Sequence, residues 1–135
     1  MKILTQKLKI NGIKICPINN TLQIIGKKFT ILILRNMFLY KQTKFNQFLE
    51  SVEDINSKTL SLRLRQLKNS DIIKRQVIPE VPIRIEYSLT EKGNALIPIL
   101  EQLGEFSTQH CSANIFIDKK PRPFKQIMAT INEEF

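Results

Sequence analysis

Residues 77–93 read VIPEVPIRIEYSLTEKG, and this stretch decides the fold of the chain. Its second half alternates strictly between apolar and polar side chains, which is the period of a half-buried strand. The apolar face carries Ile83, Ile85, Tyr87 and Leu89. Together with the preceding residues, the pattern predicts a β-hairpin with strands at 73–78 and 83–89. Pro79 and Pro82 bracket its tip, where they stiffen the turn and prevent further strand pairing.

Helical patterns lie on both sides of this hairpin. Cys16-Pro17 begins a helix that stops at Gly26, because proline suits the first helical position and glycine the end. Residues 28–39 are apolar on nearly all sides, which a buried helix and a buried strand share, although the length favours a helix. Further helices are predicted at 44–52, at 57–69 with Ser57 as its cap, and from the N-cap Thr90 onward. The helix after Thr90 is interrupted or bent at Pro98, residues 110–124 are irregular, and residues 124–134 form a last amphipathic helix.

This order predicts a mainly α fold with a small antiparallel β-hairpin, the winged helix-turn-helix architecture. A chain of 135 residues has room for one modest core and a terminal arm. We therefore divide it into a basic N-terminal arm at 1–15, a winged helix-turn-helix domain at 16–107, and a C-terminal tail at 108–135 whose helix aids dimerisation.

The helix at 57–69 is the element expected to read DNA. Leu60, Leu64 and Leu67 form its buried seam. The remaining surface offers donors and methyl groups suited to base edges, on Ser57, Lys58, Thr59, Ser61, Leu62, Arg63, Arg65 and Gln66. An ordinary amphipathic surface helix shows the same pattern, so the helix alone leaves both interpretations open. The short helix before it and the basic hairpin after it favour DNA, with Lys74, Arg75 and Arg84 of the wing on phosphates.

The charge of the chain also indicates a polyanionic partner. Lys and Arg number 21 against 12 Asp and Glu, which gives a net charge of +9. Residues 1–45 contain no acidic side chain, and residues 56–84 form a second basic zone. Nucleic acid and an acidic membrane face both fit such charge. No apolar run approaches the roughly 20 residues of a membrane span, and no secretory signal is recognised, so we expect no membrane association.

Five segments resemble one family of regulators. They are Cys16-Pro17-Ile18, residues 21–34 (TLQIIGKKFTILIL), Phe45-x-x-Phe48, residues 58–67 (KTLSLRLRQL) and residues 77–93. Spanning roughly 16–107, they are similar to the HxlR-type winged helix-turn-helix regulators of prokaryotes, relatives of the MarR type. The chain departs from the usual pattern of two glycines and a tryptophan, where it has Gly26, Lys27 and Phe29. The resemblance implies a homodimer joined by N- and C-terminal helices, with two recognition helices on a pseudo-palindromic DNA site.

Apolar residues outside the expected core agree with a dimer. They are Leu96, Leu100, Leu103 and Phe106, together with Ile3, Leu8 and Ile10 of the arm. One small domain cannot cover all of them, so we predict that they form the dimer interface.

The two cysteines are too few for a disulfide scaffold and indicate a reducing cytoplasm. Cys16 precedes Pro17 at a helix start, where backbone N–H groups and the helix dipole favour a thiolate. The resemblance implies a redox or electrophile sensor at this position, and a small packed cysteine is the alternative. Cys111 has no helix start in the pattern. It adjoins His110, but no further histidine and no CxxC spacing support a metal site.

The sequence contains no phosphate-binding glycine loop and no paired catalytic acids in a motif, so we expect no enzyme and no cofactor. Two other functions stay open, a winged helix that docks on another protein and one that binds RNA. The polar residues expected on the exposed face of 57–69 favour DNA over a protein partner, whose surface would be more apolar and aromatic. An oxidant or a small molecule is the expected kind of effector.

Overall fold

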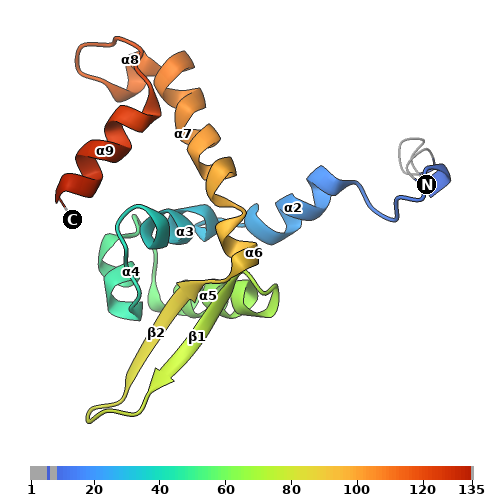
Figure 1. Cartoon of the computed structure of the whole chain (residues 1–135), viewed down its shortest axis with the longest axis vertical. Coiled ribbons are helices and arrows are strands. Elements are labelled where there is room, and N and C mark those ends of the chain that lie inside the picture. The colour runs from blue at the N-terminus through green and yellow to red at the C-terminus, as the bar shows by residue number, and fades with distance from the viewer. Residues whose placement is uncertain (1–5, 7–8, 135) are drawn as a thin grey trace.

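The computed structural model describes residue 6 and residues 9–134 of the chain. Its helices are α2 (Pro17–Ile25), α3 (Thr30–Phe38), α4 (Phe45–Ser51), α5 (Ser57–Asn69), α6 (Glu91–Asn94), α7 (Ile97–His110), α8 (Ser112–Ile115) and α9 (Phe124–Glu134). The strands β1 (Ile73–Ile78) and β2 (Arg84–Leu89) form one antiparallel hairpin. Figure 1 shows α3, α4 and α5 as a central body from which the hairpin projects to one side and α7 to the other. The predicted winged-helix class is confirmed.

The central helix α3 confirms the choice of helix over strand for this apolar segment. It is shorter than predicted, because Phe29 adopts a left-handed backbone with φ of 75° and the helix begins only at Thr30. Ile33, Leu34 and Met37 are buried in the core. Asn36 is also fully buried, which the apolar pattern did not predict.

The helix α5 spans the residues predicted for it, but its cap differs. Asn56, not Ser57, is the N-cap, since its Oδ1 accepts a hydrogen bond of 2.8 Å from the backbone N–H of Thr59. Ser57 is therefore the first helical residue. The chain turns into this cap through Asp54, which has a left-handed backbone with φ of 63°. Leu60, Leu64 and Leu67 are buried, as the seam predicted.

The hairpin keeps the predicted strands apart from one residue, because β2 begins at Arg84 and Ile83 stays exposed at the tip. Its register pairs Arg75 with Tyr87 and Ile78 with Arg84. The backbone N–H of Tyr87 donates to Thr43 O at 2.7 Å, which fixes the hairpin against the segment before α4. The wing is therefore held to the body at its base and projects freely at its tip (Figure 1).

Thr90 joins the hairpin to the end of α5. Its backbone N–H donates to Ile72 O at 3.0 Å, and its hydroxyl donates to Asp71 O at 2.6 Å and to Ile72 O at 3.1 Å. The same hydroxyl accepts from the backbone N–H of Gly93, which confirms Thr90 as an N-cap. A Cβ at Gly93 would lie 2.1 Å from Ile72 O, so only glycine permits this approach. We refer to these contacts as the Thr90 clasp.

The predicted helix after Thr90 is two helices. The break falls at residues 95 and 96, and Pro98 lies in the first turn of α7, where its missing N–H costs nothing. The bend expected at Pro98 was therefore placed too late. After α7 the short helix α8 interrupts the segment predicted to be irregular, and α9 confirms the final helix. It returns beside α7 (Figure 1), and a Cβ at Gly104 would lie 2.7 Å from the Phe124 ring.

Candidate nucleic-acid interface

The two faces of α5 differ sharply. The seam of Leu60, Leu64 and Leu67 packs into the core with Phe48 and Ile72. The other face carries Ser57, Lys58, Ser61, Leu62 and Arg65 in exposed positions. Leu62 keeps 41% of its surface exposed, although nothing in the core prevents a polar residue there. This face offers cations, hydroxyls and one apolar side chain, the mixture that base edges in a major groove accept.

Three of the predicted DNA-contacting residues on α5 are held within the molecule. Arg63 Nε donates to Lys28 O at 2.8 Å, and its Nη1 donates to Gln66 Oε1 at 3.2 Å. Thr59, whose backbone N–H bonds to the Asn56 cap, is half-buried. Arg63 and Gln66 would have to give up these bonds to reach DNA, whereas Arg65 has no such restraint among the described residues.

A basic hollow of about 420 Å³ lies between α5 and the hairpin. Its cations are Arg65 and Lys68 of α5 and Arg75 of β1, and no acidic side chain of the described residues lines it. Ser61 and Tyr87 add hydroxyl groups, and the buried Leu64 forms its floor. Lys68 was not among the residues predicted to contact DNA. Its position three residues after Arg65 on the same helix face was the signal that could have found it.

The three cations of the wing have different surroundings. Lys74 and Arg75 are exposed. Arg84 instead lies between two carboxylates, with Nη1 3.4 Å from Glu80 Oε2 and Nε 3.2 Å from Glu86 Oε1, the latter an ion pair without hydrogen-bond geometry. Its charge is therefore largely neutralised before any partner arrives, which the sequence pattern did not indicate.

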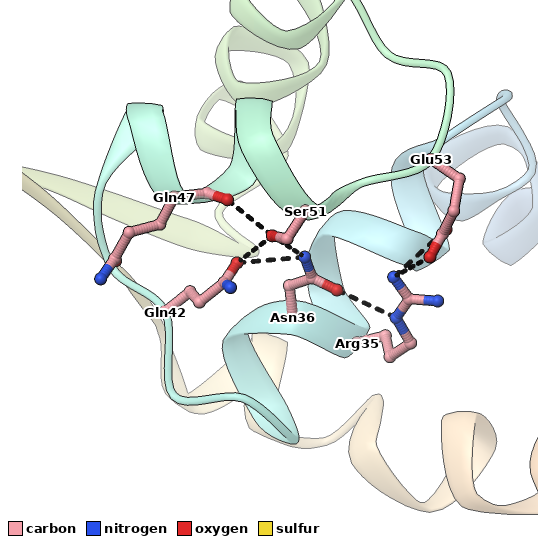
Figure 2. Close-up of polar contacts among 6 residues, drawn as sticks. All are labelled: Arg35, Asn36, Gln42, Gln47, Ser51 and Glu53. Atoms are coloured by element: carbon pink, nitrogen blue, oxygen red, sulfur yellow. Dashed lines mark hydrogen bonds and ion pairs between the residues drawn. The ribbon is translucent and has the colours of Figure 1, made fainter. Parts of the chain in front are cut away.

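A polar network joins α3 to α4 and to the turn before α5. The buried Asn36 donates through Nδ2 to Gln42 Oε1 at 3.0 Å and to Ser51 Oγ at 2.9 Å. Its Oδ1 accepts from Arg35 Nε at 2.9 Å, and Arg35 Nη2 donates to both carboxylate oxygens of Glu53 at 3.2 and 3.3 Å. Figure 2 shows the chain of contacts running from Gln42 to Glu53. It was missed because a lone Asn and a lone Arg in an apolar run reveal no partners.

This network shifts the titration of Glu53. Its own backbone N–H donates to the carboxylate, and the Arg35 guanidinium adds a hydrogen bond and charge attraction. Together these contacts outweigh desolvation and hold the pKa of Glu53 below its ordinary value of 4.5.

Cys16 is the N-cap residue of α2, directly before Pro17, as predicted. It is half-buried and free, and so is Cys111. Cys111 lies between the end of α7 and the start of the short helix α8, so it does stand before a helix, contrary to the sequence pattern. The ring of the adjoining His110 packs at 5.5 Å from that of Phe106. No group of three or more metal-ligating side chains occurs among residue 6 and residues 9–134.

The residues predicted for the dimer interface fall into two sets. Leu100 is only 8% exposed and Leu96 packs against the core, so one chain already covers most of both. Leu103 and Phe106 are 48% and 61% exposed and remain available. Ile10 is exposed, and Ile3 and Leu8 lie outside the described residues. Ile18 and Leu22 of α2 are exposed too and were not predicted to take part. The interface itself stays a prediction.

None of the helices in the described part of the chain is long and apolar enough to cross a membrane.

Comparison with known proteins places this geometry among regulators. The model of the HxlR-like helix-turn-helix family matches residues 24–115. The HTH-type transcriptional regulator YvaP of Bacillus subtilis is 36% identical over 101 residues, which cover 74% of this chain and 93% of YvaP. An HTH-type regulator of Synechocystis is 44% identical over 86 residues, and the match spans 64% of this chain and 63% of that relative.

Solved structures give the same result. The redox regulator HypR in its oxidised form superposes with a TM-score of 0.63 at 36% identity, covering 68% of this chain and 94% of HypR. The reduced form of the transcriptional regulator YodB from B. subtilis superposes with a TM-score of 0.62 at 32% identity, covering 72% of this chain and 95% of YodB. A diamide-treated YodB structure is also similar, with a TM-score of 0.58 at 32% identity, over 69% of this chain and 92% of that one. The relatives named here are regulators rather than enzymes.

Proposed function

The chain belongs to the HxlR-like helix-turn-helix family of transcriptional regulators, and we propose that it binds a specific double-stranded DNA site as a homodimer. The observation that carries the proposal is the pairing of the exposed face of α5 with the basic hollow beside it. A helix of this size fits the major groove, which is about 12 Å wide. The hollow would then receive a phosphate of the strand that borders the groove.

The contacts of α5 suggest a division of roles among its residues. Lys58, Ser61 and Leu62 are exposed on the face opposite the seam and would meet base edges. Arg65 adjoins both this face and the hollow, so it would contribute to base reading and to phosphate binding. Arg63 and Gln66, which bond to each other and to Lys28, would support the helix rather than read bases.

Binding to duplex DNA, measured at several salt concentrations, tests the proposal. We expect tight binding to a footprinted site upstream of the gene itself or its neighbours, with an affinity that falls steeply as salt rises. Arg65→Ala should lose about 1–3 kcal/mol on that site and reduce discrimination between sequences. Equal or tighter binding to RNA, or no binding to either nucleic acid, would favour the RNA or protein-docking alternatives.

The homodimer is supported by the exposed Leu103 and Phe106 on α7 and by Ile18 and Leu22 on α2. Such neighbouring apolar side chains usually mark a contact surface. Sedimentation at micromolar concentration should show a dimer, and a monomer would contradict this part of the proposal. Because its DNA partner lies in the cytoplasm, the proposal also implies that location.

We further propose that Cys16 responds to oxidants or electrophiles. HypR is named a redox regulator, and YodB has been solved after diamide treatment. Cys16 stands at the start of α2, whose exposed Ile18 and Leu22 belong to the surface proposed for the dimer. Modification there would alter the spacing of the two recognition helices without touching DNA.

Diamide treatment of single-cysteine variants tests this role. We expect wild-type protein and Cys111→Ser to lose DNA binding under diamide, and Cys16→Ser to keep it. A Cys16→Ser variant that still loses binding would show that Cys16 is a packing residue.

A further inference from the structure

A second cavity lies on the far side of the core from the basic hollow. It has a volume of about 440 Å³ and opens between α3, α7 and α9. Pockets for small organic ligands commonly occupy about 300–1,000 Å³, so this one is large enough for a compact molecule. The DNA-binding role proposed above makes no use of it.

The walls of this cavity are apolar apart from a single charge. Ile31, Leu32 and Phe38 of α3 face Leu103 of α7 and Phe124 of α9. Arg35 is the one ionisable cation in the lining, and no acidic side chain of the described residues lines the cavity. A pocket of this composition matches a ligand with an apolar body and one negative group.

Arg35 is held in place but retains donors. Its Nε and Nη2 are engaged by Asn36 and Glu53, as described above. Its Nη1 makes no hydrogen bond to any described residue, and Figure 2 shows this nitrogen pointing away from both partners. The guanidinium also lies 5.4 Å from the centre of the Tyr40 ring, which lines the same cavity. A pre-oriented guanidinium with free N–H groups is a strong site for a carboxylate.

We propose that this cavity binds a small organic carboxylate, with its carboxylate on Arg35 and its apolar body between α3, α7 and α9. The site is separate from the DNA surface, and its occupation does not depend on whether the protein binds DNA.

The partner of Arg35 connects this site with the recognition helix. Glu53 is 61% exposed, so its ion pair with Arg35 is weak and open to competition. It lies three residues before Asn56, the cap of α5. A ligand carboxylate that draws Arg35 away would release Glu53 and loosen the turn that positions α5. The bound molecule would thereby act as an effector.

Titration calorimetry of the full chain without DNA tests the site. The probes are octanoate and naphthoate, each matched by its neutral amide, octanamide and naphthamide. We expect both carboxylates to bind at least about tenfold more tightly than their amides, as charge-assisted hydrogen bonds to arginine require. Arg35→Gln should remove this preference. Glu53→Gln should tighten carboxylate binding by about twofold to fivefold, because it removes the competing carboxylate.

A cavity-filling variant locates the binding. Ser107 lines the cavity and is distant in sequence from the Arg35 network, so Ser107→Leu should weaken carboxylates and amides alike while leaving that network intact. Absence of binding by any probe, equal affinity for amide and carboxylate, or unchanged binding by Ser107→Leu would each overturn the proposal. Because no DNA is present, these outcomes are independent of those that test DNA binding.

Discussion

The two hollows of this molecule have nearly the same volume, about 420 Å³ beside the hairpin and about 440 Å³ behind α3, but opposite linings. The first gathers Arg65, Lys68 and Arg75, whereas the second is apolar with Arg35 alone. One buried core separates them, since Leu64 borders the first and Leu100 the second, and both belong to the same cluster. The difference teaches that side-chain chemistry, rather than size, decides which partner each hollow can take.

The largest expected effect comes from the shared wall. Leu64→Ala removes a side chain that is 2% exposed, so we expect the free energy of unfolding to fall by about 2–5 kcal/mol. Urea denaturation measures it. Leu62→Ala on the opposite face of α5 is the matched control, and should change stability by less than about 0.5 kcal/mol. Similar losses for the two variants would mean that α5 does not present the faces described here.

The next effect concerns only the apolar hollow. Gly104→Ala places a methyl group against the Phe124 ring, which should weaken the docking of α9 by about 1–3 kcal/mol. Hydrogen exchange should then rise within 124–131 while DNA affinity stays as in the wild type. Loss of DNA binding with unchanged exchange in α9 would show that the two hollows are not independent.

A smaller effect distinguishes the cations of the wing. Arg75→Ala should weaken binding to all DNA sequences by about 1 kcal/mol and lower the salt slope by roughly one unit. Arg84→Ala should do less, because Glu80 and Glu86 already neutralise Arg84. The sequence alone predicted a full phosphate contact for Arg84. Salt-dependent titrations of both variants compare them, and a larger slope change for Arg84→Ala would restore that original expectation.

The smallest effect is a pH dependence beside the apolar hollow. Since folding lowers the pKa of Glu53, its contribution to stability is present above its ordinary value of 4.5 and is lost as the pH falls through that value. The pair is exposed, so the contribution is at most a few tenths of a kcal/mol. Denaturation at about pH 6 and pH 4 should therefore show a slightly smaller acid loss for Glu53→Gln than for the wild type. A larger acid loss in the variant would contradict the sign of the shift.

The contrast also shows what sequence can predict. The bounds of α5 and the burial of Leu60, Leu64 and Leu67 follow from local periodicity, which one stretch of chain contains in full. The basic hollow was partly predicted, because Arg65 and Arg75 stand in two motifs whose relative placement the winged-helix order implies. The cavity at Arg35 and the pairing of Arg84 depend on which side chains meet across α3, α7, α9 and the hairpin. No local pattern contains those meetings, so the periodic signal ended at the surface of each element.

The Thr90 clasp has a mechanical consequence. It fixes the chain at the start of α6 to the carbonyls at the end of α5, and α7 continues from there for 14 residues. At a rise of about 1.5 Å per residue, α7 is an arm of roughly 20 Å pivoting near the recognition helix. A tilt of about 10° over that length corresponds to a displacement of roughly 3.5 Å. Neighbouring base pairs are about 3.4 Å apart, so a slight swing of the arm against a fixed partner would shift α5 along DNA by one rung.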